Sequence, residues 1–350
     1  MRRTGTVRRT HGNAVVRVLV LVVLLAVAAA IAWAGIGYVH FTRTPLAVSS
    51  VGQTLEIGKG EGFKGIVAQL RAEQLSDAPL LLWRALAWRL GVASKLHAGE
   101  YALSPGMTPT VLLENMAAGR VLHHRVTLVD GWTFAQVRQA LQKAPKLAHD
   151  IAKLSDADVM AKLGSAGQSP EGEFMPDTYD YVLGMSDLDV LARAHKAMQA
   201  FLAQEWSRRD TATWPQQPYQ ALILASLVEK ETAVPAERPE IAGVFERRLK
   251  IGMKLETDPS VIFGMGATYA GRIHKVDLQT DTPYNTYTRY GLPPTPIALP
   301  SRAAIHAVLH PAQGDALYFV AKGDGTHVFS ATLAEQNTAV KKYILGKKNQ

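Results

Sequence analysis

The 350-residue sequence contains no cysteine. A disulfide framework, a thiolate nucleophile and a cysteine-ligated zinc site are therefore excluded. Hydrophobic residues make up 47% of the chain, close to the usual share in globular proteins, so disorder throughout and a polytopic membrane protein are also excluded. At roughly 100–200 residues per domain, the length predicts two or three domains.

Acidic residues are missing from the N-terminal segment, where basic residues are concentrated. Five arginines within the first 17 residues supply most of the formal net charge of +8. The remainder of the chain is close to neutral, so we expect a basic tail over residues 1–17 and not a basic protein surface. Nucleic acid is therefore not an expected partner. The arginines of this tail are Arg2, Arg3, Arg8, Arg9 and Arg17.

Residues 18–41 contain no Asp, Glu, Lys or Arg. This run is long enough to cross a bilayer as a helix, and Trp33, Tyr38 and Phe41 stand at one end of it, as in an aromatic belt. The arginines before it predict a single-pass helix with the N-terminus in the cytoplasm and the remaining chain outside. A cleaved signal peptide is the alternative, since residues 32–34 read A-W-A, but the apolar run is long for a signal peptide.

Residues 50–142 repeat one pattern three times: an extended apolar stretch, a glycine and an amphipathic helix. The glycines are Gly60, Gly106 and Gly131. This alternation predicts a small α+β module that is similar to the LysM glycan-binding module; a packed adaptor without a ligand is the alternative. We expect a helical connector over 143–169, followed by a mixed α+β domain over 170–346.

Two motifs in the module suggest cofactors but lack the necessary context. The G-x-G-x-x-G run at residues 60–65 is followed by two successive helical patterns, whereas a dinucleotide site needs a βαβ unit. His123 and His124 are adjacent, so they would point to opposite faces of a strand. The sequence thus predicts no cofactor and no metal.

A helix predicted over 219–231 is the most informative feature of the larger domain. Residues 221–228 are apolar on nearly every side, which indicates a buried helix. The helix ends in Glu229 and Glu231, at the negative end of its macrodipole. Burial and the dipole would both raise a carboxyl pKa, as a general acid near neutral pH requires.

Glu229 and Glu231 are two residues apart and should point about 200° away from each other on a helix. Glu231 lies over the bulkier apolar side, so we favour it as the acid. The alternative is that both carboxylates only pair with basic neighbours such as Arg238 or Arg247. Near the C-terminus, two short apolar runs flank Asp324-Gly325 and predict a hairpin, in which we assign Asp324 and His327 structural roles.

Three motifs in sequence order then carry a family resemblance: VEKET at 228–232, TDPSVIFGMG at 257–266, and YNTY with GLPP at 284–294. With the upstream EGEFMPDTY at 171–179, these resemble the YceG-like family of endolytic peptidoglycan transglycosylases. The resemblance implies cleavage between N-acetylmuramic acid and N-acetylglucosamine without water, which leaves a 1,6-anhydro end. It also implies that the catalytic residue is Glu231, while Glu173 stands where a large apolar residue is common.

The resemblance further implies peptidoglycan strands as substrate, cell-wall synthases (penicillin-binding proteins) as partners and the bacterial cytoplasmic membrane as location. Two alternatives remain open: a hydrolytic muramidase with Asp258 or Glu171 as base, and a non-catalytic glycan-binding scaffold. Motif positions suggest a further set of sugar-contacting residues. They are Glu171, Asp177, Tyr179, Glu229, Asp258, Tyr284, Asn285 and Tyr287.

Overall fold

The computed structural model describes residues 12–346, which fold as an α+β protein, as the sequence predicts. The chain divides into two compact units. The first runs to Leu122 and includes Val182–Gly184, and the second takes His123–Tyr181 and the chain from Met185 onward. Within residues 12–346 the strands form three separate antiparallel pairs, and helices make up the rest of the regular structure. Four of the five arginines of the expected basic tail lie outside the described residues.

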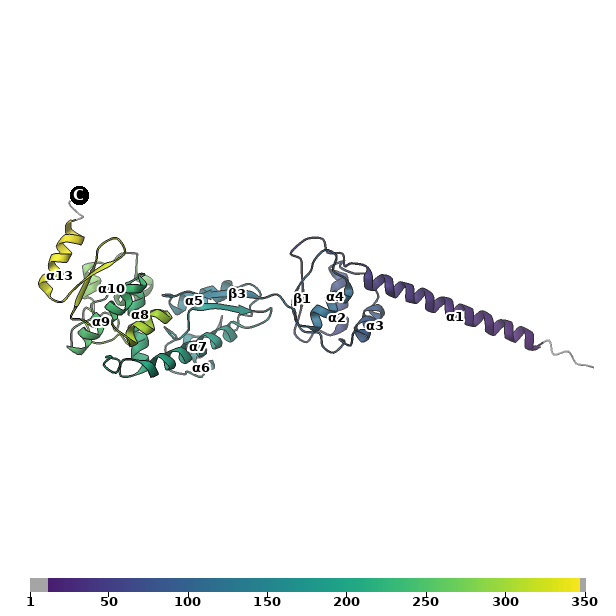
Figure 1. Ribbon diagram of the computed structural model, residues 1–350, viewed down its shortest axis with the longest axis horizontal. Helices are drawn as coiled ribbons and strands as arrows, with labels where there is room; N and C mark the ends of the chain where they lie inside the picture. Colours follow the sequence, from purple (N-terminus) through teal and green to yellow (C-terminus); the bar gives the residue numbers. More distant parts are fainter. Residues whose placement is uncertain (1–11, 347–350) are drawn as a thin grey trace, which may run out of the picture. The chain divides into compact units, whose positions relative to one another are not determined.

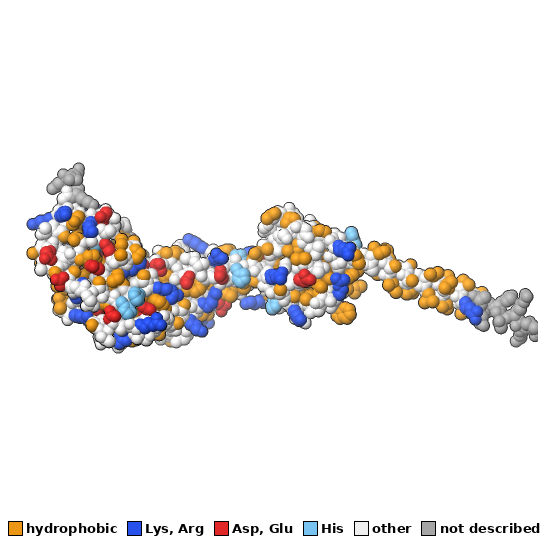
Figure 2. All heavy atoms as spheres, in the orientation of Figure 1, with side chains coloured by type: hydrophobic (Ala, Val, Ile, Leu, Met, Phe, Trp, Pro, Cys, Tyr) orange, Lys and Arg blue, Asp and Glu red, His pale blue; other side chains and the backbone are white. Residues whose placement is uncertain are grey.

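Helix α1 (Gly12–Arg43) is a single apolar helix that belongs to the first unit. From Val15 to Arg43 it is long and apolar enough to cross a membrane, and the rest of the protein leaves its most apolar 18-residue window unburied. Figure 2 shows hydrophobic side chains along the exposed helix. Leucine and valine side chains in such numbers are costly in water, at about 25 cal/mol for each Å² of apolar surface. The helix therefore fits a single-pass membrane anchor.

The remainder of the first unit is one strand pair with three helices and its own core. Strand β1 pairs with β2 in an antiparallel register that places Leu55 opposite Tyr101. The apolar positions expected on the helices, among them Leu70 and Leu112, are fully buried around Trp83. The elements are β1 (Thr54–Ile57), α2 (Phe63–Ala72), α3 (Leu80–Arg89), β2 (Gly99–Ala102) and α4 (Pro109–Ala117).

The third strand–helix repeat belongs to the second unit, although we expected it within the module at 50–142. Strand β3 (His124–Leu128) pairs with β4 (Asp177–Tyr181), and α5 (Phe134–Lys143) packs its apolar face on this pair. The physical reason is that β3 finds its partner strand about 50 residues further along the chain, a pairing that local periodicity does not reveal. Helices α6 (Asp156–Lys162) and α7 (Asp187–Arg208) follow.

Helix α8 (Pro218–Glu231) lies at the centre of the second unit (Figure 1). It packs against α7, α9, α10 and α12, and residues 221–228 are all buried. This confirms the prediction of a helix that is buried on every side. The C-terminal hairpin is also confirmed, with β5 and β6 antiparallel. The remaining elements are η1 (Pro235–Glu237), α9 (Arg238–Lys250), α10 (Asp258–Met265), η2 (Gly266–Thr268), α11 (Lys275–Gln279), α12 (Arg302–Leu309), β5 (Tyr318–Ala321), β6 (His327–Ser330), α13 (Leu333–Val340) and η3 (Lys341–Leu345).

Candidate active site

The C-terminal end of α8 opens into a cavity of about 380 Å³. Glu231 is the last residue of this helix, and Thr232 after it turns the chain into an extended conformation. The cavity gathers residues from several separated segments of the second unit, which meet only in the folded chain. Its walls include Glu231, Arg248, Asp258, Tyr287, Phe319 and His327.

Glu231 is only partly buried as a residue because it faces this cavity, yet its carboxyl group is surrounded by protein. The pKa of Glu231 is raised to about 7. Burial is the main cause; a hydrogen bond donated by Thr257 opposes it, and the nearby charge of Asp258 acts in the same direction as burial. That bond runs from the Thr257 hydroxyl to Oε1 of Glu231. At neutral pH the group is therefore divided between its acid and base forms, which suits a residue that must give and then accept a proton.

Glu229 has a different environment from Glu231. Its Oε1 lies 3.1 Å from Nη2 of Arg238, and its Oε2 accepts hydrogen bonds from the backbone and hydroxyl of Ser301. Glu229 thus holds α8 to the start of α9 and to the N-cap of α12, and it does not line the cavity. The two carboxylates contact different elements, as their helical spacing requires.

Asp258 and Tyr287 form a hydrogen-bonded pair in the wall of the same cavity. The Tyr287 hydroxyl donates to Oδ1 of Asp258 at 2.6 Å. Burial and the Asp258 carboxylate both raise the pKa of Tyr287, so its hydroxyl stays protonated at neutral pH. Of the sugar-contacting residues suggested by the sequence, these two lie beside Glu231.

His327 is a cavity residue that the sequence analysis assigned only to the hairpin. It is held by Glu237, whose Oε2 lies 2.8 Å from Nδ1 and whose Oε1 accepts from the His327 backbone N–H, also at 2.8 Å. Although burial works in the opposite direction, the hydrogen bonds from His327 and Thr232 lower the pKa of Glu237. Alternation along β6 indicates the position of His327. Phe329, two residues further on, packs against the core, and residues two apart in a strand share a face, so His327 lies on the inner face.

Asn285 and Tyr284 lie behind the cavity wall. The Asn285 side chain is completely buried and donates to the carbonyls of Asp277, Leu278 and Thr280, while its Oδ1 accepts from Tyr287 N at 2.9 Å. The Tyr284 ring packs edge-on against a phenylalanine, and its hydroxyl lies 2.9 Å from that of Thr295. These contacts shape the loop that presents Tyr287.

Glu171, Asp177 and Tyr179 lie around the β3–β4 pair and do not line the cavity. Glu171 accepts hydrogen bonds from the backbone N–H of Phe134, and burial raises the pKa of Glu171 to about 7. The Tyr179 hydroxyl donates to the Met175 carbonyl at 2.7 Å, and Asp177 is exposed. Their suggested contacts with sugar stay a prediction.

The fold and the site together define an α+β protein with an apolar N-terminal helix and a cavity lined by a carboxyl group whose pKa is raised to about 7. The YceG-like family model matches residues 55–342, and the chain belongs to this family. Over 273 residues it is 32% identical to the endolytic murein transglycosylase of Bacillus subtilis (strain 168), with 73% of this chain and 75% of the relative covered. The resemblance that the sequence motifs indicate is thus confirmed.

Two further comparisons agree. The chain is 26% identical over 280 residues to the endolytic murein transglycosylase of Streptococcus pneumoniae (strain D39 / NCTC 7466), covering 69% of this chain and 49% of that relative. The crystal structure of a putative YceG-like protein from Listeria monocytogenes matches with a TM-score of 0.54 and 27% identity, covering 82% of this chain and 98% of that one.

Proposed function

We propose that this chain is a membrane-anchored endolytic murein transglycosylase, which cleaves the bond between N-acetylmuramic acid and N-acetylglucosamine without water. The observation that carries the proposal is Glu231, a carboxyl group with a pKa of about 7 that faces a cavity. Ordinary glycosidases need two carboxylates on either side of the bond. A single group suffices when the sugar supplies its own nucleophile.

The chemistry requires Glu231 to act twice. As an acid it donates its proton to the glycosidic oxygen, and the bond from that oxygen to C1 of the muramic acid breaks. As a carboxylate it then accepts the proton of the C6 hydroxyl of the same sugar, whose oxygen bonds to C1 and closes the 1,6-anhydro ring. Because the nucleophile is tethered to the reacting carbon, proximity supplies much of the rate.

The other acidic groups of the cavity are already engaged. Glu256 lies 3.4 Å from the guanidinium of Arg248, and Asp258 accepts the hydroxyl hydrogen of Tyr287. Each of these carboxylates therefore already has a partner within the protein. Asp258 with Tyr287 instead offers a negative charge and a hydroxyl dipole that can stabilise an oxocarbenium-like transition state.

Helix α1 supports a membrane setting for the enzyme. A helix with an exposed apolar window fits a single pass through the bacterial cytoplasmic membrane. The arginines that precede it favour the N-terminus in the cytoplasm and the catalytic unit on the outer side. An enzyme held there meets glycan strands as they emerge. It would then end strand elongation beside penicillin-binding proteins, which we propose as its partners.

The decisive experiment is mass spectrometry of the muropeptides that the full-length protein, in detergent, releases from purified sacculi. We expect 1,6-anhydro ends from the native enzyme and none from Glu231→Gln. Glu256→Gln is the matched control, since it neutralises another carboxylate of the same cavity, and it should still give anhydro ends at a reduced rate.

Other products would lead to other conclusions. Reducing ends would identify water as the nucleophile and a hydrolase with Asp258 or Glu171 as base. Binding to sacculi without release would identify a scaffold. Equal release by native protein and Glu231→Gln would refute the assignment of the acid, and Glu229 would be examined next.

A further inference from the structure

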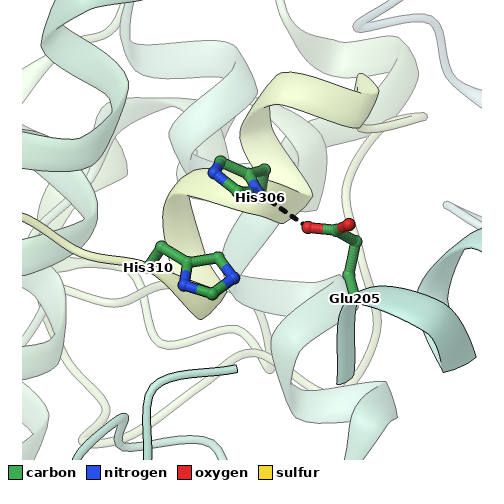
Figure 3. A group of neighbouring side chains, drawn as sticks. All are labelled: Glu205, His306 and His310. Atoms are coloured by element: carbon green, nitrogen blue, oxygen red, sulfur yellow. Dashed lines mark hydrogen bonds and ion pairs between the residues drawn. The ribbon is translucent and has the colours of Figure 1, made fainter. Parts of the chain in front are cut away.

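Two histidines and a glutamate meet where α12 lies against α7, outside the proposed active site (Figure 3). His306 and His310 are one helical turn apart, and their ring centroids are separated by 4.4 Å. Glu205 comes from α7, and one potential ligand atom from each residue lies within 4.8 Å of the others. None of the three lines the cavity of Glu231.

The carboxylate of this cluster is buried while one ring is open to solvent. Glu205 is 8% exposed, and its Oε2 lies 2.7 Å from Nδ1 of His306. The His306 side chain keeps 60% of its surface accessible. A buried carboxylate needs a cationic or hydrogen-bonded partner, and the open ring leaves a path for an ion from solvent.

Asp210 completes the arrangement around His310. Its Oδ1 lies 3.0 Å from Nδ1 of that ring, so the ionised aspartate favours the tautomer in which Nδ1 carries the hydrogen. The second nitrogen, Nε2, then keeps its lone pair, and Figure 3 shows the second ring nitrogen on the side that faces Glu205. A carboxylate that orients a ligating imidazole in this way is a usual companion of protein metal sites.

We propose that Glu205, His306 and His310 bind one divalent transition-metal ion, with Zn²⁺ the best match, and that water fills its fourth position. Two imidazoles and one carboxylate are typical zinc ligands, whereas Mg²⁺ and Ca²⁺ prefer oxygen donors alone. Tetrahedral ligands at about 2.0–2.2 Å from zinc are separated by roughly 3.4 Å. The candidate ligand atoms of the three side chains lie within 4.8 Å of one another, so side-chain rotations would bring them to this spacing.

Such an ion would tie α7 to α12. Helix α12 also packs against α8, the helix that ends in Glu231. The metal would therefore stabilise the second unit without entering the reaction. A ligand that binds only the folded state raises the unfolding temperature by mass action, and zinc at 100 times its dissociation constant should raise it by about 5–10 °C.

The test uses the full-length protein in detergent, freed of metal with a chelator and titrated with zinc chloride by calorimetry. We expect one zinc ion per chain, with binding lost in His306→Ala. Because this change also removes the hydrogen-bond partner of the buried Glu205, the fold of the variant is checked by its unfolding temperature without zinc. Asp210→Asn should weaken binding about 10–100-fold, since it removes only the group that orients His310. His123→Ala, an exposed histidine in neither the cluster nor the cavity, is the control and should bind zinc as the native chain does.

Thermal unfolding with and without zinc gives a second readout. The native chain and His123→Ala should gain stability with zinc, and His306→Ala should not. The proposal is overturned if the native chain binds no zinc, or if His306→Ala binds and is stabilised equally. Either result would leave the cluster as a hydrogen-bonded contact between Glu205 and His306.

Discussion

At the scale of single residues, the acid–base role that we propose for Glu231 comes with a cost in stability. Its pKa rises from 4.5 in a free side chain to about 7 in the folded protein. Between these values the folded state holds a proton that the unfolded state has lost, so stability falls as the pH rises from about 4.5 to 7. Glu231→Gln removes this ionisation and should stabilise the protein at pH 8 by roughly 1–3 kcal/mol.

Chemical denaturation at pH 8 and at pH 4.5 checks this prediction. The advantage of Glu231→Gln should disappear at the lower pH, where the native carboxyl group is protonated as well. An equal gain at both pH values would contradict the burial of an ionising carboxyl group, because an uncharged packing effect does not depend on pH.

His327 is the cavity residue to which the sequence analysis gave only a structural role. It lines the cavity and is fixed by Glu237. We expect His327→Ala to lower the rate of anhydro-muropeptide release by about 10–100-fold, because the cavity loses a polar group close to the reacting bond. Retained thermal stability together with this loss would separate a catalytic effect from a structural one, and the exposed His123→Ala serves as control. An unchanged rate would return His327 to the structural role that the sequence analysis gave it.

At the scale of elements, the loop after α11 depends on one buried amide. The Asn285 side-chain amide donates hydrogen bonds to three backbone carbonyls, and its oxygen accepts a hydrogen bond from the backbone N–H of Tyr287. Asn285→Ala leaves these carbonyls without their donor, at a cost of about 1–3 kcal/mol. We expect a lower unfolding temperature together with slower turnover, whereas Asn337→Ala on the exposed side of α13 should change neither. Slower turnover at unchanged stability would instead indicate direct contact of Asn285 with sugar.

The elements also show which predictions the sequence could support. The all-round apolar pattern of residues 221–228 predicts a buried helix, because the burial of a helix can be inferred from the order of apolar and polar residues within the helix itself. The partner of β3 lies on β4, and the neighbours of Glu231 come from segments that include Asp258 and His327. Such long-range pairings are set by the packing of the whole unit, so spacing along the chain could not give them.

At the scale of the whole molecule, α1 is at once an anchor and a part of the first unit. Its apolar length fits the membrane, whereas Phe41 near its end is buried and packs edge-on against Trp83 at 5.1 Å between ring centroids. A boundary for a soluble protein placed after Arg43 would therefore remove a core side chain. Loss of a buried phenylalanine side chain costs about 3–5 kcal/mol.

Two truncations separate these functions of the helix. A chain that begins at residue 37 keeps Phe41 and should leave the membrane fraction, fold as the full chain does and release anhydro-muropeptides from sacculi. A chain that begins at residue 45 should also leave the membrane, but its first unit should unfold at a lower temperature. Equal unfolding temperatures of the two truncated chains would contradict a stabilising contact of Phe41 with the core. Retention of these chains in the membrane fraction would show that a segment other than α1 holds the protein there. If both melt as expected, the apolar part of α1 serves to hold the protein in the membrane, and the C-terminal turn of the same helix stabilises the first unit.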